Sequence, residues 1–211
     1  MVVRSVTPRR CAGDEGAALV EAAFVTPVLL FLMLGILESG LLFRTYMAID
    51  AGTQDGARTA AIVGNGSTAD YDIIQSVQKS TNIIPQNQIT NLVVFNASVN
   101  GATAVVPSGC ATSTVRYQSS AAGSECNTYV PSTDWNIALA LNVNYNCTVP
   151  GYSKGYCPTT RKVALNGPQS PPDYIGIYIS VQHQYVSKLF GTSKTLASTT
   201  ITRLEPQQLQ S

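Results

Sequence analysis

The sequence contains few charged residues. Only 12% of its 211 residues are Asp, Glu, Lys or Arg, against about 25% in typical soluble proteins. The formal net charge of +1 leaves no overall field that would attract phosphate backbones, so we expect no nucleic-acid partner. A disordered chain is excluded as well, because such chains are polar and highly charged, whereas 45% of these residues are hydrophobic.

Residues that commonly carry catalysis or bind metals are also scarce. The only histidine is His183, and the sequence contains neither an H-E-x-x-H metal motif nor a phosphate-binding P-loop. Asp173 and Glu205 are the acids considered as partners of His183, but a packing role explains a histidine at the end of a strand-like segment better. No Cys-x-x-Cys pair is present, which argues against zinc. The sequence therefore predicts a protein that is not an enzyme, with no cofactor and no metal site.

One long apolar run lies near the N-terminus. Residues 22–37, between Glu21 and Glu38, carry no charge, and a helix of this length measures about 25 Å, close to the roughly 30 Å of bilayer hydrocarbon. The apolar core of a removable secretory signal is much shorter. We therefore expect a transmembrane helix over residues 17–43, with Glu38 near the outer membrane interface.

The basic residues that flank this run predict its orientation. Arg4, Arg9 and Arg10 precede it, whereas the first basic residues after it are Arg44 and Arg58. Basic flanks tend to stay in the cytoplasm. We expect a single-pass protein of the cell membrane, with a cytoplasmic N-terminus and an extracytoplasmic C-terminal part.

The start of the run contains the most specific pattern. A short basic segment ends in Gly16, Ala17 follows, and Glu21 lies five residues after Gly16, inside the apolar run. A carboxylate in a membrane segment is costly and is often functional. At one turn into the helix, however, the positive end of the helix dipole explains Glu21 equally well.

This arrangement resembles the class III signal of type IV pilins and pseudopilins, which a prepilin peptidase cuts after a glycine. More closely, GAALVEAAFVTPVLLFLMLGILESG followed by AGTQDGARTAA resembles the TadE-like minor pseudopilins of the tight-adherence (Flp) pilus. Residues 195–205 are also similar to the closing strand of that family. The sequence departs from the family pattern at Ala22 and Ser39, which follow the two glutamates where the family often has aromatic residues.

The resemblance implies cleavage between Gly16 and Ala17, as well as a role for Glu21 in assembly. The cut exposes an amine on Ala17, and the Glu21 carboxylate would pair with it, because an unpaired charge in an apolar setting is costly. The implied partners are a prepilin peptidase, the major pilin and other minor pseudopilins, an inner-membrane assembly platform and membrane lipid. The alternative is a membrane-anchored binding module unrelated to pili, for which Gly16 is a coincidence.

This interpretation divides the chain into four segments. Residues 1–16 are a basic leader, 17–43 the transmembrane helix, 44–63 a helical stalk, and 64–211 an extracytoplasmic head. A bend or break in the stalk is expected near Gly52 and Gly56, because each glycine weakens a helix by about 1 kcal/mol. Finding the mature N-terminus after residue 40 would overturn the scheme.

The head is expected to have an α+β fold with an antiparallel sheet and one or two helices. Residues 64–67 should end the long helix, and Asp70 or Ser67 should cap a second one that ends before Pro85. Alternating apolar residues predict strands over the ranges 89–99, 137–145, 175–183 and 195–204. Because no helical pattern separates these strands, we expect them to pair in an antiparallel manner.

Five cysteines are present, and Cys11 lies in the predicted leader. The remaining four, Cys110, Cys126, Cys147 and Cys157, form an even set on the oxidising side of the membrane. We favour the pairs Cys110–Cys126 and Cys147–Cys157, because each closes a short loop rich in Gly, Ser or Pro. A loop of about 15 residues closed in this way stabilises a domain by roughly 3 kcal/mol.

Overall fold

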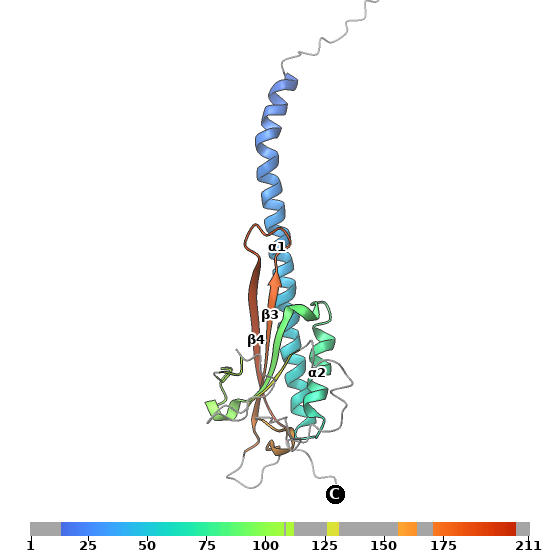
Figure 1. Ribbon diagram of the computed structural model, residues 1–211, viewed down its shortest axis with the longest axis vertical. Coiled ribbons are helices and arrows are strands. Elements are labelled where there is room, and N and C mark those ends of the chain that lie inside the picture. Colours follow the sequence, from blue (N-terminus) through green and yellow to red (C-terminus); the bar gives the residue numbers. More distant parts are fainter. Residues whose placement is uncertain (1–13, 108, 112–125, 131–155, 164–170, 206–211) are drawn as a thin grey trace, which may run out of the picture. The chain divides into compact units, whose positions relative to one another are not determined.

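The structure is a computed structural model that describes residues 14–107, 109–111, 126–130, 156–163 and 171–205 (Figure 1). The chain divides into two compact units, Met1–Leu41 and Leu42–Ser211. We call them the N-terminal unit and the head unit. The helix α1, Asp14–Val63, contributes residues to both. Helix α1 contains Pro27 without interruption, as proline-containing membrane helices commonly do.

The head unit contains a sheet of four strands with one further α-helix, α2, Ala69–Ser80. The strands are β1, Ile89–Asn96; β2, Cys126–Tyr129; β3, Tyr174–Gln184; and β4, Ser193–Arg203. Their order across the sheet is β2-β1-β3-β4, and every neighbouring pair is antiparallel. The expected α+β fold with an antiparallel sheet is therefore confirmed.

The C-terminal part of α1 packs on this sheet and on α2. A Cβ atom placed on Gly52 would lie 2.7 Å from Thr81 Cγ2 and 3.2 Å from Ile179 Cδ1. One placed on Gly56 would lie 2.7 Å from Val77 Cγ2 and 3.3 Å from a β3 side chain. The missing side chains thus allow the backbones to approach closely. Because this packing offsets the weak helix propensity of glycine, α1 shows no break at these positions.

Residues 44–63, expected to form a stalk, belong to the head unit and contribute to its core. Ala48, Ile49 and Ala60 are buried in the same cluster as the inward-facing side chains of β3. A polar contact extends this interface to β4, where Thr200 donates a hydrogen bond to Thr53 at 2.9 Å. The helix is therefore one layer of the head, lying against the sheet.

The turn between α1 and α2 follows the expected signals in part. Helix α1 ends at Val63, and Gly64 adopts a left-handed φ of 56°. The N-cap of α2 is Thr68, so the prediction that Asp70 or Ser67 caps this helix is wrong. Asp70 lies inside the first turn and is fully buried, because tertiary partners rather than the local backbone bind its carboxylate.

Three of the four predicted strands lie among the described residues. The predictions for β3 and β4 agree with the structure to within one or two residues. Strand β1 ends at Asn96, earlier than predicted, because the Asn96 side chain accepts a hydrogen bond from Ser98 N and a 3₁₀ turn follows. The predicted strand over 137–145 lies outside the described residues. Strand β2 was not predicted from the sequence.

The sheet is buried on both faces over β1. One face meets the helices, with Leu92 and Val94 in the main core. On the other face, Val93 and Phe95 form a second cluster with Cys110 and with Cys126 of β2. This arrangement explains why seven of the eight β1 residues are buried, a pattern without simple alternation.

Candidate functional site

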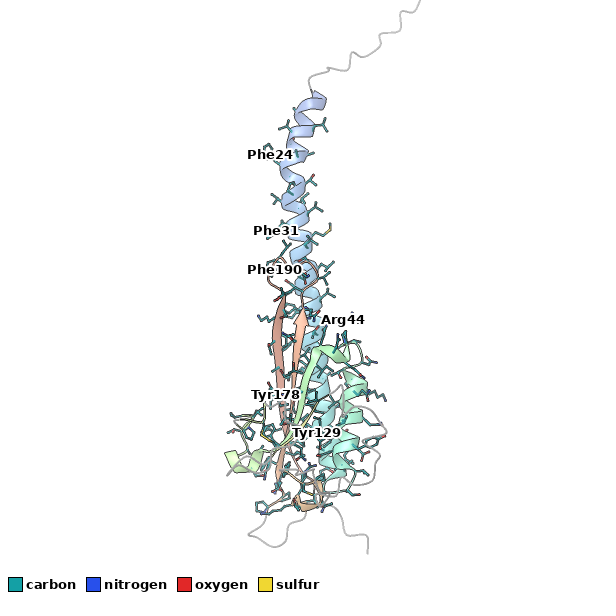
Figure 2. The ribbon with its side chains drawn as sticks, viewed as in Figure 1. Phe24, Phe31, Arg44, Tyr129, Tyr178 and Phe190 are labelled. Carbon is teal, nitrogen blue, oxygen red and sulfur yellow. A yellow bond between two sulfur atoms is a disulfide. The ribbon has the colours of Figure 1, made fainter. Side chains whose placement is uncertain are left out.

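The N-terminal unit presents apolar side chains to its surroundings. Helix α1 contains the one stretch, among the described residues, that is long and apolar enough to cross a membrane. Figure 2 shows Phe24 and Phe31 pointing away from the helix, and 75% and 52% of their surfaces are exposed. Transfer of each such side chain from water to an apolar environment is favourable by about 1.5–3 kcal/mol of free energy. This surface is therefore suited to contact with lipid or with another apolar helix.

Gly16 lies in the first turn of α1, in open surroundings. Among the described residues, no heavy atom lies within 4 Å of a Cβ placed on it, and its backbone has no positive φ. Gly40 is in the same situation. Neither packing nor backbone conformation therefore requires glycine at these two positions, in contrast to Gly52 and Gly56.

Glu21 and Ala17 lie on the same side of α1, because residues four apart in a helix are neighbours. Ala17 and Glu21 are both exposed. The rise between them is about 6 Å, which a glutamate side chain spans easily. An amine at Ala17 would therefore come within reach of the Glu21 carboxylate, both within one helix and between two helices side by side.

Glu38 differs from Glu21 in its exposure. Only 2% of the surface of Glu38 is exposed, so its carboxylate has little access to solvent or lipid. The next residue, Ser39, donates a hydrogen bond to the Gly35 carbonyl at 2.8 Å, which satisfies its hydroxyl within the helix. The two acids of the apolar run are thus placed in different environments.

This segment matches the family of TadE-like proteins over residues 16–58. The resemblance recognised in the sequence is therefore confirmed for this part of the chain, and the family suggests involvement in a Tad pilus. The comparisons with curated proteins and with solved structures gave no match. The TadE-like segment ends within α1, and α2 and the sheet lie beyond it.

The disulfide between Cys110 and Cys126 lies outside the TadE-like segment. This is the pair favoured from the sequence, and its Cα atoms are 6.4 Å apart. Both residues are fully buried against Val93 and Phe95 of β1. Cys157 is disulfide-bonded as well, whereas Cys147 lies outside the described residues. This bond links Cys110 to the start of β2, on the face of the sheet opposite the helices.

A buried ionic network in the head unit was missed from the sequence. The Asp70 carboxylate in α2 accepts hydrogen bonds from Arg161 Nη2 at 2.5 Å, Tyr129 Oη at 2.5 Å and Asn127 Nδ2 at 2.8 Å. The Arg161 guanidinium also lies 4.6 Å from the centre of the Tyr156 ring. At most 3% of each of these side chains is exposed. The network fastens β2 and the segment 156–163 to α2.

No local signal could have revealed this network. The sequence position of Asp70 predicts a helix cap, and Arg161 lies in a segment rich in proline and threonine. The two residues are 91 positions apart. Because a buried carboxylate is tolerated only with charged and hydrogen-bonding partners, the network explains the burial of Asp70 and Arg161. Its role is to hold the head together.

His183 is a packed residue of β3. Only 5% of its surface is exposed, its Nδ1 lies 3.1 Å from Thr45 Oγ1, and its ring packs edge-on against Tyr185. Asp173, one of its considered partners, instead accepts a hydrogen bond from Lys162 N at 2.9 Å. Among the described residues, no cluster of three or more His, Cys, Asp or Glu could hold a metal ion.

A Gly-x-Ser-x-Gly sequence occurs at residues 151–155, around Ser153. These residues lie outside the described part of the chain. In α/β-hydrolases the same spacing forms a sharp turn between a strand and a helix, and such folds are built on a mostly parallel sheet. Every strand pair in the described sheet is antiparallel. The described fold therefore gives this motif no hydrolase context.

Proposed function

We propose that the chain is a minor pseudopilin of a Tad (Flp-type) pilus, cut by a prepilin peptidase between Gly16 and Ala17. Residues 1–16 are the leader, residues 17–43 hold the protein in the cell membrane, and the rest forms an extracytoplasmic head. The protein acts as a structural or assembly component. Its partners are the major pilin, other minor pseudopilins, the inner-membrane assembly platform and membrane lipid.

The observation that supports this proposal is the coincidence of two boundaries at one residue. The TadE-like match begins at Gly16, where the basic leader ends. Within the described part of the chain, neither packing nor backbone conformation requires Gly16 to be glycine. A residue that the fold does not require is better explained by an external partner, and a peptidase that reads the residue before its cut is such a partner.

Glu21 is proposed to act after the cut. The amine of Ala17 and the Glu21 carboxylate carry opposite charges in an apolar environment, where an unpaired charge costs several kcal/mol. Pairing within one helix satisfies both charges in a single subunit. Pairing between helices additionally fixes the register of one subunit against the next, so that Glu21→Gln is expected to impair assembly without affecting cleavage.

The decisive experiment is the mass of the mature product after co-expression with the peptidase. We expect the wild-type chain to lose residues 1–16, and Gly16→Leu to retain them, because a larger side chain replaces the glycine at the cut. The matched control is Gly40→Leu, since Gly40 is equally open in α1, and we expect it to be processed like the wild-type chain.

Two results would contradict the proposal. A mature N-terminus downstream of residue 40 would mean that the apolar run is a removed signal and not an anchor. Processing of Gly16→Leu at the wild-type site would mean that the glycine is not recognised. Either result would leave the described fold of the head unit unchanged.

A further inference from the structure

The turn between β3 and β4 exposes large apolar side chains. Of the surfaces of Val186, Leu189 and Phe190, 70%, 50% and 53% are exposed, respectively. The last backbone hydrogen bond before the turn runs from Tyr185 N to the Thr192 carbonyl at 3.1 Å. Turns between strands are usually built from Gly, Asn, Asp, Pro and Ser. Three of the six residues 186–191 are large and apolar. This composition suggests that the turn contacts something other than water.

The position of the turn in the head unit follows from contacts along α1. Gly56 lies against Ile177, Gly52 lies against Ile179, and Thr45 lies against His183. Strand β3 therefore runs antiparallel to α1, toward the residues at which α1 enters the head unit. Beyond His183, the hairpin extends by up to roughly 10 Å at about 3.3 Å per residue.

The same extension carries the turn to the residues that end the proposed transmembrane helix. Leu42 and Phe43 lie only two or three residues before Thr45, a rise of about 3–4.5 Å. The turn therefore reaches at least the level of these residues. Figure 2 shows Phe190 at the turn, at the same end of the head unit as Arg44. Phe43 and Met47 are exposed here too, at 64% and 70%.

The charged residues of this end of the head unit are all basic. Arg44 in α1, Lys188 in the turn and Lys194 in β4 are exposed, and residues 42–49 and 184–194 contain no Asp or Glu. Exposed apolar side chains surrounded by basic residues are typical of surfaces that lie in the headgroup region of a membrane with anionic lipid.

We propose that the β3–β4 turn, residues 185–191, is a second membrane contact of this protein. Val186, Leu189 and Phe190 enter the headgroup region of the bilayer, and Lys188 binds the phosphate of an anionic phospholipid. This inference rests on the proposed insertion of residues 17–43, because that helix brings the turn to the lipid surface. With two contacts, the head unit is held in a fixed orientation on the membrane before assembly.

A lipid partner fits these observations better than a protein one. The turn and residues 42–43, which end the proposed transmembrane helix, lie at the same end of the head unit, so insertion of the helix delivers the turn to the interface without any further component. The three exposed basic residues, in ranges that contain no Asp or Glu, also match anionic lipid.

The test uses the full chain, with Trp135→Phe to remove the only tryptophan and a new tryptophan at Leu189. The protein is reconstituted at low protein-to-lipid ratio in vesicles of phosphatidylethanolamine and phosphatidylglycerol. We expect Leu189→Trp to show a blue-shifted emission, a loss of intensity with lipids brominated near the headgroup end of the chain, and protection from aqueous iodide. Val186→Trp provides a second position with the same expectation.

Two reference positions make the outcome unambiguous. Leu30→Trp, in the middle of the apolar run, is expected to be quenched by lipids brominated deep in the chain. Ser67→Trp, beyond the far end of α1, is expected to be quenched by iodide alone. If the turn positions behave like Ser67 while Leu30 is quenched by lipid, the second contact is refuted and the membrane anchor stands. If Leu30 is also quenched by iodide alone, the anchor itself and both proposals fail.

Discussion

The two parts of α1 form one helix but meet different surroundings. In the N-terminal unit, the large side chains from Leu19 to Leu37 are exposed, and Gly16 and Gly40 have open space where a side chain would be. In the head unit, Ala57 and Ala60 are buried, and a side chain on Gly56 would collide with α2. Packing within the described structure does not explain the apolar residues of the first part. In the second part, packing against α2 and the sheet explains the small residues.

This difference bears on what the TadE-like segment contains. The match extends to residue 58 and so includes both parts of the helix, although the α2 and β3 surfaces that receive Gly52 and Gly56 lie outside it. The segment therefore combines two parts. The first is apolar and suited to contact with lipid or other helices, and the second has a face of small residues, including Gly52 and Gly56, that packs against α2 and β3. The rest of the head only has to offer a surface that approaches this face closely.

The largest effect on the head unit is expected from Asp70→Ala. The variant leaves the Arg161 guanidinium buried without its counter-ion, and breaking a buried ion pair typically costs about 3–5 kcal/mol. The measurement is the free energy of unfolding of the full chain in detergent, from denaturant titration. The proposed cleavage after Gly16 should be unchanged, because the network lies outside the N-terminal unit.

The matched control is Asp72→Ala, in the same turn of α2. Asp72 is partly exposed and accepts a hydrogen bond from Thr68 at 3.1 Å, so its loss should cost at most about 1 kcal/mol through the helix dipole. An equal loss of unfolding free energy in the two variants would mean that the buried network does not stabilise the head unit.

The next largest effect is expected from removal of the described disulfide. Replacing Cys110 and Cys126 together by alanine should lower the free energy of unfolding by about 3 kcal/mol, because a loop of this length is no longer closed in the unfolded chain. Cys11→Ala is the control, since Cys11 lies in the proposed leader. A double variant as stable as the Cys11 variant would contradict the prediction.

The sequence predicted those elements whose residues follow a local pattern. Strands β3 and β4 alternate apolar and polar residues over their whole length, and the end of α1 is marked by Gly64. The α+β class followed from these elements. The apolar run and its flanking glycine and glutamates are equally local, which is why the sequence alone suggests the proposed cleavage and pairing site.

What the sequence did not reveal depends on contacts between distant residues. Strand β2 contains Asn127 and Thr128, polar residues that are buried because Asp70 and the Cys110 carbonyl bind their side chains. A four-residue strand of this composition has no period to detect. Asp70 was assigned to a cap for the same reason, since its true partners are distant in the chain.

The smallest effect, and the sharpest comparison between the two parts of α1, is expected from alanine at Gly56. The added methyl group would meet Val77 Cγ2 at 2.7 Å, and Val77 is fully buried and β-branched, so it has little freedom to move. Overpacking costs about 1–3 kcal/mol, partly offset by the roughly 1 kcal/mol gain in helix propensity. We expect a net loss of up to about 2 kcal/mol in the free energy of unfolding.

Gly40→Ala makes the same chemical change in the same helix, but with no heavy atom within 4 Å of the new methyl group. The unfolding of the head unit should therefore be unchanged or slightly less favourable in this variant. A destabilisation by Gly40→Ala equal to that by Gly56→Ala would mean that the two glycines serve the same purpose. Because the structure places one in open space and the other against α2, we expect Gly56→Ala to be destabilising and Gly40→Ala not to be.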